Sequence, residues 1–320
     1  MTLFPIPIVL KIMQPIKETI DNIVAQISQV ILGKELKIRL VLTGLMARGH
    51  VLIEDVPGVG KTTLAHVLAQ VLGLSFQRIQ FTSDLLPADI IGVSIYDKGQ
   101  FKFHVGPIFA QMILADEVNR ATPKTQSALL EAMGEHQVTV EGETRLLPVP
   151  FFVLATKNPL HQVGTFPLPE SQLDRFMIRL ELGYPNHSTE RALLKGRERR
   201  EIINELQAIV TVQDILEIQN AVPKVHVSEF LIDYLQAILE FSRQSPRYRV
   251  GLSPRAGLAI LHCAQAWALM QGRDHVVPED VQTVVYPVLR HRIILNYEAE
   301  AEEVTTDRVI KHILGKVNAP

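Results

Sequence analysis

The sequence predicts an α/β domain with a mainly parallel five-stranded sheet, followed by a second domain built of helices. The first observation is that short β-prone runs alternate with helical stretches from residue 20 to about residue 184. The second is the change after residues 183–186, Gly-Tyr-Pro-Asn, beyond which helical patterns dominate. A chain of 320 residues is long enough for two such domains. We therefore expect the α/β domain over residues 1–185, with a short N-terminal helix, and a C-terminal all-helical domain over residues 186–320.

Five short apolar runs, bounded by turn or helix signals, are the candidate core strands. They are residues 51–54, 76–81, 112–115, 151–156 and 176–182. Two other segments alternate around a Gly-containing turn, which is typical of β-hairpins. The first covers residues 92–109 with its turn at Lys98-Gly99, inside an insert over about residues 85–110. The second covers residues 136–149 with its turn at Glu141-Gly142. We expect both hairpins to project from the sheet.

The second domain is marked by helix start signals, in which a capping residue or a proline precedes an apolar helical pattern. These signals are Thr211 with Asp214, Ser228 with Glu229, Ser253 with Pro254, and Pro278 with Glu279-Asp280. Helical patterns dominate this part of the chain, and each of these signals begins one. They favour a helical architecture for it.

The clearest functional motif lies between the first strand and the helix that follows it. A loop containing Gly and Pro ends in Gly60-Lys61-Thr62-Thr63, and apolar residues then recur at helical spacing. Glycines let successive N–H groups turn inward, and a helix N-terminus favours negative charge, so this order builds a pocket for a nucleoside triphosphate. Lys61 would reach the β- and γ-phosphates, and Thr62 would place its hydroxyl on Mg²⁺. The expected cradle consists of Pro57, Gly58, Val59, Gly60, Lys61, Thr62 and Thr63.

One position departs from the general P-loop pattern G-x-x-x-x-G-K-[ST], because Asp55 stands where the pattern has Gly. The alternative interpretation is a Gly-rich turn that only joins a strand to a helix. A partner motif later in the chain favours the nucleotide site instead.

That partner motif is Asp116-Glu117, which directly follows an apolar strand. A strand tip beside the P-loop would let Asp116 hold Mg²⁺ through water, while Glu117 would orient and deprotonate the attacking water. An apolar run followed by Asp-Glu also occurs by accident in many chains. Its position after Lys61 and at the end of a buried strand favours the functional interpretation.

Asn158 follows another buried strand, which we expect to lie next to the strands bearing the P-loop and Asp116-Glu117. Its neutral amide could hydrogen-bond both the γ-phosphate and the water without adding charge. The alternative is that Asn158 only forms a turn with Pro159.

Two arginines are further candidates. Arg175 follows a short helix just before the last core strand, where a purely structural role is equally open because a cation also gains from the helix dipole. Arg255 lies in the first turn of the helix that Ser253 and Pro254 begin, against the dipole preference for anions there. An anionic group should compensate Arg255, and a γ-phosphate would do so.

Composition argues against several classes of protein. Lys plus Arg number 32 against 34 for Asp plus Glu, so there is no general basic footprint for nucleic acid. The single Cys263 cannot form an internal disulfide, and the eleven histidines lack metal-ligand spacing. No window approaches the roughly 20 apolar residues of a membrane span, and the opening segment lacks a basic leader and a small-residue cleavage site. We expect a soluble, cytoplasmic protein.

Several separate motifs together resemble the MoxR family of AAA+ ATPases, from about residue 20 to residue 295. They are ILGKE, EDVPGVGKTTLA, FQRIQFTSDLLPADIIGVSIYD, FHVGPIFA, LADEVNRATPKTQSALLEAM, FFVLATKNP, GTFPLPESQLDRFMIRLELGYP and LSPRA. The resemblance implies a P-loop AAA+ core with a helical lid. The two hairpins then correspond to the helix-2 insert and the pre-sensor-1 hairpin, at about residues 85–110 and 136–149. Asp55 matches the family pattern EDVPGVGKT.

The resemblance also implies a role for each candidate residue, with ATP and Mg²⁺ as cofactors. Ile31, Leu32 and Gly33 would touch adenine. Lys61 and Thr62 would bind phosphates and Mg²⁺, Asp116 and Glu117 would be Walker B, Asn158 sensor 1, Arg175 the arginine finger and Arg255 sensor 2. Arg175 would act on a neighbouring subunit of a ring, usually a hexamer. Arg120 also matches the family, and an interface contact is one interpretation of it.

These observations favour an ATPase that remodels, matures or activates a client protein through motion between its two domains. Relatives are associated with metalloenzyme maturation and with proteins that carry von Willebrand factor A domains, so such a client is an expectation. A nucleic-acid-remodelling motor is the alternative, because helicase-type relatives point similar hairpins into a pore, but the near-neutral charge disfavours it. A GTP switch is disfavoured because no NKxD-type motif follows. A scaffold without turnover is disfavoured because every catalytic position is filled.

Overall fold

The protein is described by a computed structural model that defines residues 8–97, 99–158, 164–196, 199–244 and 248–319. Five strands form one parallel sheet in the order β2-β5-β8-β1-β9. Their bounds are β1 Val51–Glu54, β2 Phe76–Gln80, β5 Met112–Asp116, β8 Phe152–Lys157 and β9 Ile178–Leu180. All five predicted strands are present, and the last is shorter than expected. The strand that leads to Asn158 lies between those that lead to the P-loop and to Asp116, as predicted.

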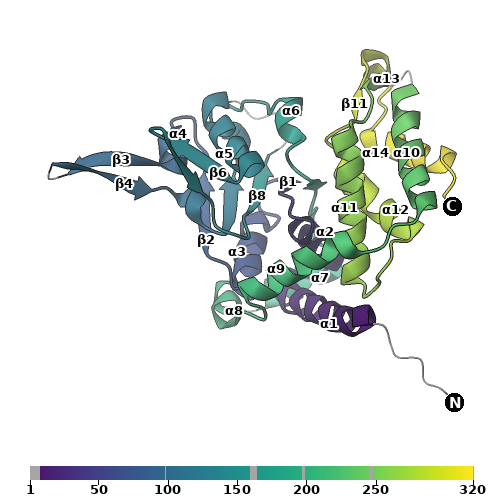
Figure 1. The fold of residues 1–320 in the computed structure, drawn as a ribbon, viewed down its shortest axis with the longest axis horizontal. Coiled ribbons are helices and arrows are strands. Elements are labelled where there is room, and N and C mark those ends of the chain that lie inside the picture. Colours follow the sequence, from purple (N-terminus) through teal and green to yellow (C-terminus); the bar gives the residue numbers. More distant parts are fainter. Residues whose placement is uncertain (1–7, 98, 159–163, 197–198, 245–247, 320) are drawn as a thin grey trace.

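Side chains alternate between the two faces of this sheet, so each face has its own apolar core. Ile53, Leu114 and Leu154 face a cluster that includes the helices α2, Glu35–Met46, and α3, Lys61–Val71. The neighbouring residues Leu52, Ile113 and Val153 face a second cluster that includes α4, Pro87–Ile91, and α5, Pro123–Glu135. The short helix α6, Glu170–Leu173, precedes β9. The result is a sheet between two helical layers (Figure 1).

The N-terminal helix α1, Ile8–Ser28, corrects one expectation, because its 21 residues make it a long helix rather than a short one. A stripe of apolar residues recurs every three or four positions and is buried along it. The stripe consists of Ile16, Ile20, Ile23, Val24 and Ile27. It packs on α2, α3 and α11, so burial sustains the helix beyond the internal Pro15.

The second half of the chain is mainly helical (Figure 1). Its helices are α7 His187–Lys195, α8 Arg199–Glu205, α9 Val212–Ala221, α10 Glu229–Gln244, α11 Pro254–Met270, α12 Pro278–Leu289, α13 Tyr297–Ala301 and α14 Thr306–Lys316. One short antiparallel pair, β10 Tyr248–Val250 with β11 Ile294–Leu295, departs from the all-helical expectation. Strands of two or three residues carry no alternating pattern that a sequence could show. Among the described residues, single-turn 3₁₀ helices lie at Pro107–Phe109, Val118–Arg120 and Val222–Lys224.

The predicted start signals cap these helices. Ser228 Oγ accepts a hydrogen bond from Leu231 N at 3.3 Å, and Ser253 Oγ accepts one from Ala256 N at 3.2 Å. Thr211 and Asp214 form the expected reciprocal capping box. Within the described part of the chain, no helix has the length and apolar character needed to cross a bilayer.

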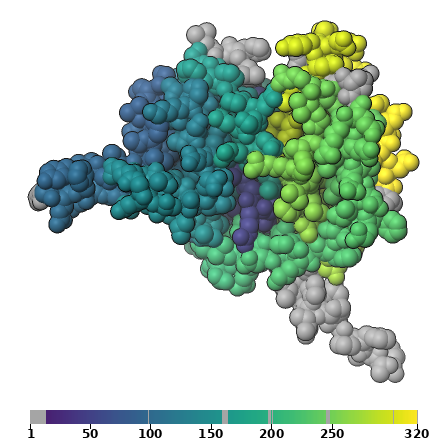
Figure 2. Space-filling model, turned by 45° about the horizontal axis from the view of Figure 1, so that its top comes forward, coloured from purple at the N-terminus to yellow at the C-terminus, as the bar shows by residue number. Residues whose placement is uncertain are grey.

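Both predicted hairpins form. The first pairs β3, Gly92–Asp97, with β4, Gln100–Val105, and we call residues 92–105 the arm. It extends well beyond the body of the protein (Figures 1 and 2). Lys98, at its predicted turn, lies outside the described residues. The second hairpin pairs β6, Gln137–Val140, with β7, Glu143–Leu146, and turns at the predicted Glu141-Gly142. The Arg145 guanidinium lies 3.9 Å from the centre of the Phe103 ring, so the two hairpins touch.

Candidate nucleotide-binding site

The loop between β1 and α3 forms an open cradle of backbone. Gly58 and Gly60 have φ angles of 85° and 96°, a conformation that residues with a Cβ rarely adopt. No heavy atom lies within 4 Å of the position that a Cβ would take on either glycine. The loop therefore leaves room for a ligand to approach its backbone, as the sequence predicts for a phosphate cradle.

Lys61 is the first residue of α3, and its ammonium group bonds to this loop. Lys61 Nζ donates to the carbonyl oxygens of Asp55 at 2.5 Å and Val56 at 3.3 Å, and to Asn158 Oδ1 at 3.1 Å. Burial lowers the pKa of Lys61, whereas the nearby carboxylates of Asp55, Asp116 and Glu117 act to raise it. The site therefore holds a cation among oxygens at the mouth of the cradle.

Asp116 ends β5 and reaches the start of α3. Its Oδ1 accepts a hydrogen bond from Thr156 Oγ1 at 2.5 Å, and its Oδ2 lies 3.5 Å from Thr62 Oγ1. The same Oδ2 accepts two hydrogen bonds from the Arg78 guanidinium, at 2.7 and 3.1 Å. The structure thus brings together Thr62 and Asp116, the two side chains predicted to hold Mg²⁺.

Glu117 adopts a left-handed backbone conformation, with φ of 58°, just after β5. This conformation is uncommon for a residue with a side chain, and such residues are enriched at functional sites. Glu117 Oε1 accepts from Asn158 Nδ2 at 2.8 Å, and Oε2 accepts from Gln80 Nε2 at 3.1 Å and Arg120 Nη1 at 3.0 Å. Arg120 therefore has a partner inside its own chain, and an interface contact for it stays a prediction.

Asn158 joins the two halves of the site. Its amide oxygen accepts from Lys61 and its amide nitrogen donates to Glu117, so three predicted residues form one hydrogen-bonded chain. The side chain is buried, with the residue only 4% exposed. Pro159, the partner in the alternative turn interpretation, lies outside the described residues. The amide of Asn158 nonetheless points into the predicted site.

Sequence reasoning missed three residues around the two carboxylates. Arg78 and Gln80 project from β2, and Thr156 projects from β8 and also accepts a hydrogen bond from Glu117 N at 2.9 Å. Arg78 and Gln80 are two residues apart on a strand that pairs with β5, and Gln80 lies level with Asp116. That spacing is the signal that could have found them, because residues two apart share one face of a strand.

Asp55 ties the cradle to the segment that leads into the second half of the chain. Its Oδ2 accepts a hydrogen bond from Gly183 N at 2.6 Å, and its Oδ1 accepts one from Val56 N at 2.8 Å. Glycine, the residue of the general P-loop pattern, could make neither bond. The departure at this position therefore has a structural role.

The predicted adenine segment, residues 31–33, lies near the linker between the two domains, which includes Gly183 and Tyr184. Ile31 is buried, Leu32 is partly buried, and Gly33 has φ of 67°. A Cβ on Gly33 would lie 2.9 Å from Thr189 Oγ1 of α7, so the segment packs against that helix. The next residue, Lys34, donates to the carbonyl oxygen of Tyr184 at 2.8 Å. Because Gly183 and Tyr184 are consecutive, the cradle and the adenine segment converge on one stretch of chain.

The two arginine candidates lie away from this cluster. Arg175 Nη1 donates to the carbonyl oxygen of Leu130 in α5 at 2.6 Å, and a Cβ on Gly134 would lie 2.5 Å from that nitrogen. Gly134 therefore permits the arginine to lie against α5. Arg255, in the first turn of α11, has a side chain 63% exposed, with Nη1 3.8 Å from Asp174 Oδ2. The expected anionic partner of Arg255 is a carboxylate from the preceding domain.

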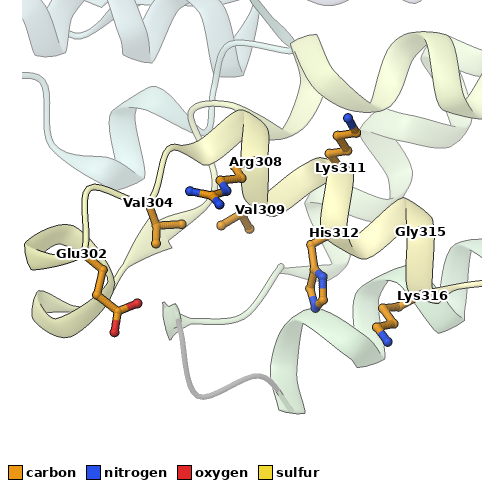
Figure 3. Close-up of a pocket in the computed structure, with 8 residues that line it drawn as sticks. All are labelled: Glu302, Val304, Arg308, Val309, Lys311, His312, Gly315 and Lys316. Atoms are coloured by element: carbon orange, nitrogen blue, oxygen red, sulfur yellow. The ribbon is translucent and has the colours of Figure 1, made fainter.

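A separate hollow of about 560 Å³ lies on α14. Its lining side chains point in different directions, with Lys311 directed away from His312 and Lys316 (Figure 3). It does not gather functional groups around one point, in contrast to the cradle.

Comparisons with known proteins agree with this geometry. The family described as "ATPase family associated with various cellular activities (AAA)" matches residues 50–178, and the AAA lid domain family matches residues 240–313. Protein YeaC of Bacillus subtilis, which is uncharacterized, is 44% identical over 93% of each chain. Chaperone MoxR1 of Mycobacterium tuberculosis is 40% identical over 94% of this chain and 82% of its own length.

A solved structure extends this likeness to three dimensions. A crystal structure of a protein from Cytophaga hutchinsonii is 42% identical, covers 96% of this chain and 97% of its own, and has a TM-score of 0.90. The parallel five-stranded core, the lid and the order of the motifs all agree with one assignment. The chain belongs to the MoxR family of AAA+ ATPases.

Proposed function

We propose that this protein hydrolyses ATP with Mg²⁺ and uses the reaction to remodel or activate a client protein. The observation that carries the proposal is the hydrogen-bonded chain from Lys61 through Asn158 to Glu117, which begins at the open glycine cradle. It brings together a cation, an amide and a carboxylate, which would bind phosphate, align the water and act as general base. We also propose the domain boundary near residues 185 and 186, where the linker contacts the cradle through Asp55.

The residues present suit this ligand. The cradle would receive the phosphates, with Ile31, Leu32 and Gly33 near the adenine. Bound MgATP supplies the bond to be broken and a cation that neutralises developing charge. Thr62 and Asp116 would hold the Mg²⁺. Within the described residues, no group of three His, Cys, Asp or Glu side chains could hold a metal unaided, so the phosphates would complete the coordination.

The protein groups would act by positioning and by moving one proton. Lys61 Nζ would exchange the carbonyl oxygens of Asp55 and Val56 for phosphate oxygens. Glu117 would orient the attacking water and accept its proton at a carboxylate oxygen, and Asn158 would align that water. Three donors orient the Glu117 carboxylate here, and because its two oxygens offer about four acceptor sites, a site on Oε1 remains for the proton.

The arginine positions support an assembly in which chains share active sites. Arg175 lies against α5 of its own chain rather than at the cradle. We therefore propose that it acts as an arginine finger on a neighbouring protomer, in a ring that is a hexamer as in typical AAA+ proteins. Arg255 would act as sensor 2 by moving from Asp174 to the γ-phosphate.

The arm supports a protein client. Tyr96 and Phe101, next to its tip, are 64% and 73% exposed, and their rings stack edge to face with centres 5.1 Å apart. Exposed aromatic side chains at the end of a projecting hairpin suit contact with another protein. The relative named as a chaperone supports the same class of partner. A protein with a von Willebrand factor A domain is our proposed client.

The test measures phosphate release from ATP by the purified protein, with and without Mg²⁺. Nucleotide binding is measured separately. Wild type should release phosphate only with Mg²⁺. Glu117→Gln should bind ATP as wild type does, yet lose about 10²- to 10⁴-fold in turnover, because the general base is removed. Failure of the wild type to bind or hydrolyse ATP would refute the proposal. Unchanged turnover in Glu117→Gln would show that another group activates the water.

A further inference from the structure

A buried arginine joins the lid to the segment that carries Arg175. Arg292 follows α12, and its side chain is only 5% exposed. A guanidinium has five N–H donors, and here five hydrogen bonds use them. The acceptors are Asp174 Oδ1 at 2.7 Å, Asp174 O at 3.2 Å, Phe176 O at 2.8 Å, Met177 O at 3.1 Å and Val288 O at 2.5 Å. Only Val288 belongs to the lid, so the other bonds cross to residues 174–177.

Two more lid residues hold the same short segment. His291 Nε2 lies 2.8 Å from Phe176 O, and burial lowers the pKa of His291 well below its ordinary value, so the neutral ring donates there. Arg255 approaches the second carboxylate oxygen of Asp174 at 3.8 Å. We call Arg255, His291, Arg292 and residues 174–177 the seam. Arg255 of α11 and two residues that follow α12 thus hold one stretch of the core.

The position of Arg175 within the seam is informative. Lid residues form hydrogen bonds with residues 174, 176 and 177, on both sides of Arg175. The Arg175 side chain instead donates a hydrogen bond to Leu130 O in α5. Its backbone is thus fixed on both sides by bonds to the lid. A shift of the lid relative to the sheet must move this backbone or break several bonds to a buried charge, and breaking them is strongly unfavourable.

We propose that Arg292 is a positioning residue that couples the lid of one protomer to its own Arg175, and so to hydrolysis in the neighbouring protomer. The inference rests on the proposed function, in which Arg175 completes the adjoining site. Arg292 itself touches neither nucleotide nor water. It sets where the finger lies as the lid moves.

The test uses Arg292→Lys, which keeps the charge but loses the planar fork of donors. Alone, it should lose at least tenfold in turnover while ATP affinity at its own site stays within twofold of wild type. Arg273→Gln is the matched control, because Arg273 forms a two-pronged ion pair with the buried Asp280 inside the lid. The control should lower thermal stability comparably but leave turnover per folded protomer within twofold of wild type.

Mixing of variants shows where Arg292 acts. Lys61→Ala protomers should lack hydrolysis but keep an intact Arg175. The reference mixture contains equal amounts of Lys61→Ala and Arg175→Ala protomers. Its ATPase activity should exceed the mean activity of the two separate preparations. Arg292→Lys mixed with Lys61→Ala should be restored in the same way, because the defect lies in the finger it offers rather than in its own site.

The outcomes separate the two proposals. No restoration in the reference mixture would overturn the action of Arg175 on a neighbour, and the coupling with it. If activity is restored in the reference mixture but not in the mixture with Arg292→Lys, the coupling is overturned while the action of Arg175 on a neighbour stands. Wild-type turnover in Arg292→Lys would also overturn the coupling, and so would weakened ATP binding in that variant. If Arg292→Lys does not fold, His291→Leu takes its place, because it removes only the bond to Phe176. It should lose less turnover than expected for Arg292→Lys, and mixing with Lys61→Ala should restore that turnover. Unchanged turnover in His291→Leu would contradict the coupling.

Discussion

The carboxyl edge of the sheet, where the cradle meets Asp116 and Glu117, and the seam are both crowded with charge, but they bond differently. At the edge, Lys61 donates to carbonyl oxygens of its own loop, and the Glu117 carboxylate is shared among three donors from separate segments. At the seam, the Arg292 guanidinium forms five bonds, and four of them reach residues 174–177.

Under the proposed function, this difference separates a site that exchanges its ligands from a contact that holds two domains together. We propose that bound MgATP replaces the partners at the edge with phosphate, metal and water. The partners at the seam have no such alternative, since a buried charge that loses its acceptors is strongly penalised. Changes at the edge should therefore alter chemistry, whereas changes at the seam should alter stability and the coupling between chains.

The largest expected effect is that of Arg175→Ala. It tests whether Arg175, at the seam of one chain, contributes to hydrolysis at the edge of a neighbouring chain. Loss of an arginine finger lowers turnover by about 10³ to 10⁵ in enzymes of this chemistry, and ATP affinity should persist because the cradle is intact. Phosphate release and nucleotide binding measure the two properties separately. Normal turnover in the variant would remove Arg175 from the reaction.

Asn158→Ala should be next in size, because it removes the link between Lys61 and Glu117 at the edge. Removing one preorganised donor from an active site costs on the order of 10² in turnover. Steady-state kinetics should show the loss in kcat with little change in stability. An effect on thermal unfolding alone would make Asn158 a structural residue.

Asp55→Gly restores the general P-loop pattern and should weaken the join between the edge and the linker. The lost bond from Gly183 N to the carboxylate is charge-assisted, so the free energy of unfolding should fall by about 2 kcal/mol. Chemical denaturation measures this change. Asp55→Asn is the control, because its amide oxygen can still accept the bond and should preserve part of the stability. Equal stability of wild type and Asp55→Gly would show that the join contributes nothing.

His291→Gln should have the smallest effect, on the pH dependence of stability at the seam, because its amide can still donate to Phe176 O where His291→Leu cannot. Burial and the neighbouring Arg292 hold the pKa of His291 well below its value of about 6.5 in an unfolded chain. The unfolded state therefore binds more protons below pH 6.5, so stability is full above that pH and is lost as the pH falls through it.

The variant should lose less stability than the parent between pH 7.5 and pH 5.5, as measured by denaturation at each pH. Burial also lowers the pKa of His50 to about 4, so the variant should keep a residual acid sensitivity. A pH dependence identical to that of the parent would show that His291 does not titrate with unfolding.

The edge was largely predictable from the sequence, because strand tips and the P-loop follow local rules. Asp116, Glu117 and Asn158 each come directly after a buried strand, and the carboxyl ends of parallel strands meet at one edge. Arg78 and Gln80 escaped prediction, since polar residues on a short strand are ordinary unless its neighbour is known. The length of α1 was also missed, because its helical stripe is stabilised by tertiary burial rather than by capping signals.

The seam could not be predicted in the same way. Arg292 follows a helix end and carries no motif, and its bonds reach residues more than a hundred positions away in the chain. The anionic partner of Arg255 was expected, but the identity of Asp174 depends on how the lid lies against the sheet. Contacts of this kind arise from packing between domains, which local patterns do not encode.

The central claim is that one chain binds the triphosphate and a neighbouring chain helps to break it. Its most direct test is specific phosphate release at saturating ATP and Mg²⁺ over a dilution series, with the mass of the assembly measured at each concentration. Activity per protomer should rise with the assembled fraction, and dilute monomer should be nearly inactive. A monomer that hydrolyses ATP at the full rate would contradict the account.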